Sequence, residues 1–312
     1  GRLMHRLIRE FFRKRFEDPS LEEAHDGAVL PIEGGRLAFT TDSYVVRPLF
    51  FPGGDIGRLA VCGTANDLAM CAAEPLYLSC GFIVEEGLPI ETLDRIALSM
   101  RETAREAGVR LVTGDTKVVE RGKGDGLYLN TAGVGRPCRG RVVRPSEVRP
   151  GDAVVLSGDI GAHAAAVLSV REGLEFETAL ASDCAPLWPQ VRALLDAGVE
   201  VHCLRDLTRG GLATALNEIA ETAGLRIAVS EEAVPVRREV AAACELLGLD
   251  TLYMACEGRF IAFVPQAQAD RALKTLEKAA PGQSPALLGH VAGAAKGEVI
   301  LKTRLGVDRV LD

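Results

Sequence analysis

The sequence predicts a protein of two α/β domains with mixed sheets, and three observations support this prediction. Its 312 residues exceed the usual size of one domain and suit two units of roughly 150 residues each. Strand-like runs alternate with helical patterns in both halves. Between the halves lies a basic stretch, Cys138–Gly151, whose Pro145 and Pro150 indicate a linker. We therefore expect one domain at 1–148 and a second at 149–312.

The expected elements follow from the spacing of apolar residues. At the start of the chain, apolar residues from Leu3 to Phe12 repeat at helical spacing and predict an amphipathic helix. In the first half we predict strands at Arg36–Thr40, Leu76–Val84, Val109–Thr113 and Leu127–Val134, with helices at Ile56–Ala72 and Ile90–Ala107. In the second half we predict strands at Ala153–Leu156 and Arg259–Val264, with helices at Ala162–Val170, Gly211–Ala223 and Ala267–Ala279. This alternation is typical of an α/β domain in each half.

Composition and charge exclude several classes of protein. Apolar residues make up 47% and charged residues 25%, which is ordinary for a globular protein. The net charge of -7 argues against nucleic acid or an anionic membrane surface as the main partner, because either needs a basic footprint. The eight cysteines show no CxxC spacing, which predicts a reduced, cytoplasmic protein without a zinc site. An acidic protein that binds polyphosphate needs cations between its own negative charges and the phosphates. Clustered Asp residues should therefore hold a divalent metal.

Five Asp residues stand in similar contexts, which we interpret as strand ends and turns. They are Asp26 in HDGAVL, Asp42 in FTTDSYVV, Asp67 in GTANDLAM, Asp115 in VTGDTKVV and Asp206 in RDLTRGG. The phosphate loops GxxxxGK[ST] and GxGxxG do not occur. Any single Asp in a turn is usually a cap or turn former. If the five converge, carboxylates about 4 Å apart repel by roughly 4 kcal/mol, so they would need Mg²⁺ to stay ionised together, and metal-bound ATP is the ligand that we expect.

Short polar residues and an arginine stand close to two of these Asp residues. Thr64 and Asn66 lie in GTAND, on a helical segment whose small neighbours allow a ligand to approach closely. A helix packed through small residues is the alternative. Thr208 and Arg209 precede two glycines at the start of a predicted helix, which suits phosphate binding by backbone N–H groups and a guanidinium. A plain helix entry turn is the alternative there.

Two further charged residues are candidates for the chemistry itself. Lys117 lies two residues after Asp115, so both side chains share one side if the chain is extended there. A lysine in this position is more often a surface charge. Glu257 precedes a predicted apolar strand, where its carboxylate could face a cleft or equally well the solvent.

Seven segments together resemble the HypE family of hydrogenase maturation factors. They are FTTDSYVVRPLFFPGGDIGRLAVCGTANDLAM, YLSCGFIVEEGLP, VTGDTKVVERG, NTAGVG, SDCAPL, LRDLTRGGL and CELLGLDTLYMACEGRF, and they extend over nearly all of the chain. The family shares a superfamily with aminoimidazole ribonucleotide synthetase, selenophosphate synthetase and thiamine monophosphate kinase. These enzymes have ATP sites that are rich in Asp and lack a P-loop.

The resemblance implies a PurM-like architecture, in which an N-terminal domain dimerises through a β-barrel and a C-terminal α/β domain closes over ATP. It implies metal or phosphate positions at Asp26, Asp42, Asp67, Asp115 and Asp206, further nucleotide contacts at Thr64, Asn66, Thr208 and Arg209, and positions near the reacting group for Lys117 and Glu257. Mg²⁺ and ATP are the implied cofactors.

The implied activity is ATP-dependent dehydration of a carboxamide on a C-terminal cysteine to a thiocyanate, which supplies the cyanide ligand of [NiFe]-hydrogenase. Phosphorylation would convert the amide oxygen, a poor leaving group, into phosphate. The implied partners are a second copy of the chain, the carbamoyltransferase HypF and the iron-carrying HypC–HypD complex, with no nucleic acid and no membrane. A kinase or synthetase of the same superfamily that acts on a free metabolite, and a non-catalytic scaffold, remain alternatives.

The sequence departs from the family at both ends. The glycine-rich N-terminal segment of the family is reduced to Gly1-Arg2, and the terminal Pro-Arg-Ile-Cys of the family does not appear before Asp312. None of the eight cysteines replaces the missing one by position. We therefore expect these residues to form an ATP-binding body without the cysteine that carries the substrate.

Overall fold

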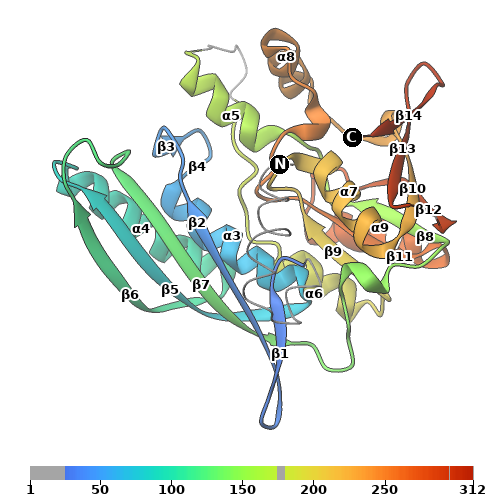
Figure 1. Cartoon of the computed structure of the whole chain (residues 1–312), viewed down its shortest axis with the longest axis horizontal. Coiled ribbons are helices and arrows are strands. Elements are labelled where there is room, and N and C mark those ends of the chain that lie inside the picture. Colours follow the sequence, from blue (N-terminus) through green and yellow to red (C-terminus); the bar gives the residue numbers. More distant parts are fainter. Residues whose placement is uncertain (1–24, 174–179, 295, 312) are drawn as a thin grey trace.

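The chain forms two α/β domains that lie side by side, each built on its own sheet (Figure 1). The computed structural model describes residues 25–173, 180–294 and 296–311. The predicted fold class of two α/β domains with mixed sheets is confirmed for these ranges. The amphipathic helix predicted between Leu3 and Phe12 lies outside the described residues.

The N-terminal domain is a five-stranded sheet in the order β1-β2-β7-β5-β6. Its strands are β1 (Ala28–Ile32), β2 (Gly35–Tyr44), β5 (Ala73–Glu85), β6 (Arg110–Val119) and β7 (Leu127–Pro137), and a two-stranded ribbon is formed by β3 (Phe50–Phe51) and β4 (Gly54–Asp55). The helices are α3 (Ile56–Met70) and α4 (Ile90–Ala107), which cover one face of the sheet (Figure 1). The β5–β6 pair is parallel and the others are antiparallel.

Helix α3 is the central element, because it lies between the N-terminal sheet and the C-terminal domain (Figure 1). It begins at Asp55, whose Oδ1 accepts hydrogen bonds from the backbone N–H groups of Gly57 and Arg58 at 2.7 and 3.1 Å. The helix is buried along almost its whole length, and small residues let it approach the sheet closely. At Gly63, a Cβ atom would stand only 2.3 Å from the hydroxyl oxygen of Tyr44 on β2.

The opposite face of the N-terminal sheet is open in the single chain. Side chains alternate between the two faces of a strand, and the open face carries Phe39, Tyr77 and Ile83, each 41% exposed. Strand β6 is an edge strand and is exposed along nearly its whole length. The described strands of one chain therefore form an open sheet with edges at β1 and β6 and no closed barrel.

The C-terminal domain is a seven-stranded mixed sheet in the order β14-β13-β10-β12-β8-β11-β9. Its strands are β8 (Asp152–Leu156), β9 (Cys203–Asp206), β10 (Leu225–Ser230), β11 (Phe260–Pro265), β12 (Ala286–Ala294), β13 (Glu298–Lys302) and β14 (Asp308–Leu311). The α-helices are α5 (Ala162–Arg171), α6 (Trp188–Asp196), α7 (Gly211–Ala223), α8 (Arg238–Leu247) and α9 (Ala269–Ala279). Short 3₁₀ turns are η3 (Pro145–Glu147), η4 (Glu231–Ala233), η5 (Thr251–Tyr253) and η6 (Gln266–Gln268).

The core of this domain lies on both faces of its central strands. Strands β8 and β11 are buried throughout, apart from the partly buried last residue of β11, and they are continuous apolar runs, as expected where both faces are covered. Leu156 and Phe263 pack with α7 on one face, whereas Val155 and Ala262 pack with α6 and α9 on the other. Strand β9 is held at the edge of this sheet, next to β11. Its last residue, Asp206, therefore faces the N-terminal domain from a rigid support.

Two smaller sequence expectations concern the whole chain. All eight cysteines are free thiols, as their spacing predicted. Among the described residues, no helix combines the length and the apolar character needed to cross a bilayer.

Candidate active site

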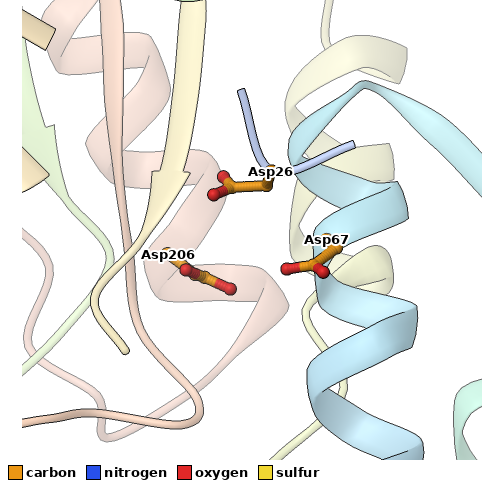
Figure 2. Close-up of side chains that lie close together, drawn as sticks. All are labelled: Asp26, Asp67 and Asp206. Carbon is orange, nitrogen blue, oxygen red and sulfur yellow. The ribbon is translucent and has the colours of Figure 1, made fainter. Parts of the chain in front are cut away.

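Three carboxylates meet at the junction of the two domains. Asp26 lies just before β1, Asp67 lies on α3 and Asp206 ends β9, and their side chains point toward one another (Figure 2). One oxygen from each carboxylate lies within 4.8 Å of the others. We call Asp26, Asp67 and Asp206 the carboxylate triad. Two of its members come from the N-terminal domain and one comes from the C-terminal domain, so the triad exists only when the domains are together.

Burial and mutual repulsion make the triad electrostatically unfavourable without a cation. Burial raises the pKa of Asp206 to about 7, with the charge of Asp26 as the next cause. Burial also raises the pKa of Asp26 to about 6, although the Arg205 guanidinium opposes this shift. The pKa of Asp67 is raised well above its ordinary value by burial and by the neighbouring carboxylates. A bound cation would favour the ionised forms of all three.

The polar contacts of the triad leave room for such a cation. The Thr40 hydroxyl donates to Asp67 Oδ2 at 2.8 Å, and Thr208 donates to Asp206 Oδ1 at 3.2 Å. Arg205 Nε lies 3.0 Å from Asp26 Oδ1. The other oxygen, Asp26 Oδ2, is buried without a hydrogen bond. His25 Nδ1 lies 3.9 Å from this oxygen. Clustered carboxylate oxygens are the donor set that hard cations such as Mg²⁺ prefer.

The structure corrects our interpretation of where the five Asp residues lie. Asp67 is inside helix α3, and Asp42 and Asp115 are inside strands β2 and β6, rather than at strand ends or turns. Only Asp26 and Asp206 stand at the ends of strands. The predicted helix Ile56–Ala72 already includes Asp67, so the sequence itself indicated a helical position for this carboxylate.

The structure also shows that only three of the five join in one cluster. Asp42 shares the helix-covered face of β2 with Thr40 and Tyr44, and its charge raises the pKa of both Asp67 and Glu257. It therefore flanks the triad. Its Oδ1 accepts a hydrogen bond from the backbone N–H of Ser43 at 2.8 Å.

Asp115 and Lys117 lie on the other face of the sheet. In the β5–β6 register they stand beside Gly81 and Ile83, whose side of the strand is the open face. Their side chains are 70% and 72% exposed, and Lys117 Nζ lies 3.2 Å from Asp115 Oδ2. Within one chain this pair cannot reach the triad, because the sheet separates them. Asp115 therefore does not join the triad of its own chain, and its role at a metal or phosphate site stays a prediction.

Thr64 and Asn66 have contacts that the sequence did not indicate. Thr64 is fully buried, and its hydroxyl interacts with the hydroxyl groups of Tyr44 and Thr131 on the helix-covered face of the sheet. Asn66 hydrogen bonds to the backbone of the C-terminal domain at Ala185 and Leu187. Direct nucleotide contacts by either residue stay a prediction.

Thr208 and Arg209 open helix α7 on the C-terminal side of the junction. The two glycines that follow them adopt positive φ angles of 69° and 62°, and a Cβ at Gly211 would stand 2.6 Å from the carbonyl oxygen of Met254. This turn places the N-terminus of α7 beside the triad. Arg209 is exposed, and its charge lowers the pKa values of Asp206 and Asp26, so it lies close enough to meet an anion there.

Glu257 lies in the loop before β11 and is partly buried. Burial, followed by the charges of Asp206 and Asp183, raises its pKa well above the ordinary value. A carboxylate with a raised pKa is a stronger base than one in water. Of the two residues predicted to take part in the chemistry, Glu257 is the one that this chain places near the triad.

Three residues of the site escaped the sequence analysis. Arg205 pairs with Asp26, Thr40 holds Asp67, and Asp183 contacts the Glu257 backbone. All three stand inside the segments that resemble the family, and Arg205 and Thr40 lie one and two residues from the selected Asp206 and Asp42. No spacing rule distinguishes them, because their roles depend on contacts between segments that are far apart in sequence.

Comparison with known proteins agrees with this geometry. Residues 24–136 match the family model of the AIR synthase related protein, N-terminal domain, and residues 149–302 match its C-terminal domain. The carbamoyl dehydratase HypE of Rhizobium leguminosarum bv. viciae is 49% identical over 313 residues, covering 100% of this chain and 89% of that protein. The chain belongs to the HypE family. The family expected from the sequence motifs is thus confirmed.

Solved HypE structures show the same fold. A crystal structure of a HypE–HypF complex contains a chain with a TM-score of 0.92 and 43% identity, with 98% of this chain and 99% of that chain covered. A crystal structure of the hydrogenase maturation protein HypE in complex with ATP has a TM-score of 0.87 and 47% identity, with 100% of this chain and 95% of that chain covered.

Proposed function

We propose that this chain is an ATP-dependent carbamoyl dehydratase, which converts the S-carboxamide of a C-terminal cysteine to an S-cyanate. The product would supply the cyanide ligand in the maturation of [NiFe]-hydrogenase. The observation that carries the proposal is the buried carboxylate triad at the domain junction, with the base candidate Glu257 beside it. This arrangement provides both a place for metal-bound phosphates and a group that accepts a proton.

The triad is the proposed binding site for Mg²⁺ and the phosphates of ATP. Asp26, Asp67 and Asp206 would hold the metal, with Asp42 close by, and the metal would neutralise phosphate charge. Arg209 and the N-terminus of α7 face the same place and suit the remaining phosphate oxygens. Binding of ATP by the related HypE protein supports this proposal.

A cavity beside the triad suits the nucleoside. It has a volume of about 280 Å³ and is lined by His25 and Gly27, the two neighbours of Asp26. Val29 and Val143 give it apolar walls, and Arg36, Arg141 and Arg144 also line it. Cavities with apolar walls and a small number of polar groups commonly bind small molecules. We therefore propose that the base of ATP binds here while the phosphates extend to the triad.

The reaction divides into phosphoryl transfer and elimination. The amide oxygen attacks the γ-phosphorus of ATP, and the bond to ADP breaks. One N–H proton is lost as the O–P bond forms, which leaves an O-phosphorylated imidate. The second N–H proton then leaves as the C–O bond breaks, so the carbon and nitrogen become a nitrile and the amide oxygen departs in phosphate. In this proposal Glu257 accepts the second nitrogen proton, because burial raises its pKa and makes its carboxylate a stronger base.

The test follows the mass of the substrate cysteine. Full-length protein with a carbamoylated C-terminal cysteine should lose the mass of one water in the presence of ATP and Mg²⁺. Glu257→Gln should bind ATP normally and lose no water, whereas Glu277→Gln on the exposed face of α9 is the matched control. Normal dehydration by Glu257→Gln would leave the base unidentified. No mass change in the wild-type protein would reject the proposed function.

We also propose that the chain forms a homodimer through the open face of the N-terminal sheet. Support comes from its exposed apolar side chains and its uncovered edge strand β6, because such surfaces usually mark an interface. A second copy that covers this face would bury Asp115 and Lys117. In this dimer the pair would lie at the interface, and a role for Lys117 in neutralising phosphate charge is a proposal that rests on the family resemblance.

Two other partners are proposed from the family. The HypE–HypF complex supports an interaction with the carbamoyltransferase HypF, which would load the carbamoyl group. An interaction with the HypC–HypD complex, as the acceptor of cyanide, and a cytoplasmic location remain proposals that rest on the family resemblance.

A further inference from the structure

We infer that Asn66 and Asp183 are positioning residues, which together hold Glu257 in place across the domain junction. The inference rests on the proposed function, in which Glu257 accepts a proton. It concerns two side chains that contact the backbone of Glu257 from opposite ends of the residue. Neither one is needed to bind metal or phosphate.

Asn66 reaches from α3 into the C-terminal domain. Its Nδ2 donates to the carbonyl oxygens of Ala185 at 3.1 Å and Glu257 at 3.3 Å, and its Oδ1 accepts from the N–H of Leu187 at 2.8 Å. The residue is 2% exposed. Both N–H bonds of an Asn amide are used by these contacts, together with one lone pair of the oxygen. Both N–H groups of the amide therefore hold the protein backbone in place, and one lone pair of its oxygen is left over.

Asp183 holds the other end of Glu257. Its Oδ1 accepts from the backbone N–H of Glu257 at 3.0 Å, whereas its Oδ2 is buried without a hydrogen bond. Burying a carboxylate oxygen in this way is costly. This energetic cost is consistent with a requirement for a hydrogen-bond acceptor opposite the backbone N–H of Glu257.

The segment that carries Asp183 is itself fixed to the N-terminal domain. The backbone N–H of Ser182 donates to the carbonyl oxygen of Pro52 at 2.8 Å, and Arg58 Nε donates to the carbonyl oxygen of Cys184 at 2.9 Å. Asn66 continues the attachment at Ala185 and Leu187. We call residues 182–187 the bridging segment. It ties the Glu257 loop to helix α3.

The arrangement links the base to the metal site through one helix. Asn66 and Asp67 are consecutive on α3, so their side chains point about 100° apart around the helix axis. Asp67 points to the triad, and Asn66 points to Glu257 and the bridging segment. Helix α3 thereby fixes the distance between the phosphate site and the base. A displacement of about 1 Å in such a group can lower the rate about 100-fold.

The first experiment separates positioning from nucleotide binding. Asn66→Ala should lower the rate of dehydration about 100-fold, while the dissociation constant of ATP, measured by calorimetry with Mg²⁺, stays within about threefold of wild type. Asn217→Ala is the matched control, because Asn217 donates from Nδ2 to a backbone carbonyl inside α7. A normal rate, or a weaker affinity for ATP with a normal rate at saturation, would overturn the inference.

A second pair of variants keeps the inference testable if Asn66→Ala does not fold. Asp183→Asn retains an oxygen that accepts from the Glu257 N–H, so its rate should stay within about threefold of wild type. Asp183→Ala removes the acceptor and should lose most of the rate. Wild-type rates of dehydration in both variants would contradict the positioning role. Loss of the rate in both variants would also contradict it, because it would point to a need for the negative charge of Asp183. Absence of dehydration in wild type would overturn the proposed function and this inference together.

Discussion

Replacing Asp206 by asparagine should stabilise the metal-free protein, and the gain should increase with pH. The triad brings three buried carboxylates together with the Arg205 guanidinium beside them. Asparagine has nearly the same shape as aspartate and carries no charge. The variant therefore removes the repulsion of one carboxylate while leaving the packing of β9 almost unchanged.

The magnitude follows from the pKa of Asp206, which is raised from 3.8 to about 7. One pKa unit corresponds to about 1.4 kcal/mol, so complete ionisation in the folded state costs up to about 4 kcal/mol. Because the pKa is higher in the folded state than in the unfolded state, the folded state binds more protons. The stability that the folded state gains from the higher pKa of Asp206 is therefore complete below about pH 4, and it is lost as the pH rises to about 7. Between pH 5.5 and 8.5 the loss is about 2 kcal/mol.

The assay is urea unfolding in EDTA at pH 5.5 and 8.5, with Asp196→Asn on α6 as an exposed control. Asp206→Asn should be more stable than wild type, by about 2 kcal/mol more at the higher pH. Mg²⁺ at 100 times its dissociation constant should stabilise wild type by about 2.7 kcal/mol and the variant by much less. The reasoning fails if the variant and wild type show the same pH dependence, or if Mg²⁺ stabilises both equally.

Three other variants test separate parts of the structure. Asp67→Asn should weaken Mg²⁺-dependent ATP binding at least about tenfold, because it removes a charged ligand; unchanged affinity in calorimetry would exclude the triad as the site. Ile83→Asp, in the open face of the sheet, should convert a dimer to a monomer in light scattering, unlike Leu246→Asp on α8. A monomeric wild-type protein at micromolar concentration would count against the proposed dimer. Gly63→Ala should lower the thermal stability by roughly 1–3 kcal/mol, because its Cβ would overlap the hydroxyl group of Tyr44; an unchanged melting temperature would show that the sheet adapts.

The sequence by itself determined the fold class, the family and many of the elements. Helices α4 and α7 have the bounds that apolar periodicity predicted, because each buries one face against the rest of its domain. The central strands β8 and β11 were found as short apolar runs. Strands β10 and β12 to β14 escaped prediction. Strands β10 and β13 alternate over only 6 and 5 residues, and the burial of β12 and β14 does not alternate regularly. The spacing of apolar residues indicates which face of a segment is buried. It does not indicate which other segment covers that face.

Only the tertiary structure decided which of the selected residues form the site. Asp26, Asp67 and Asp206 meet because a loop, a helix and an edge strand converge at the domain junction. Asp115 had an equally persuasive motif, yet strand alternation places it on the opposite face of the sheet. Asn66 contacts three backbone groups in two segments, both more than 100 residues later in the chain. Such contacts depend on how the domains pack, and packing between distant segments leaves no regular spacing in the sequence.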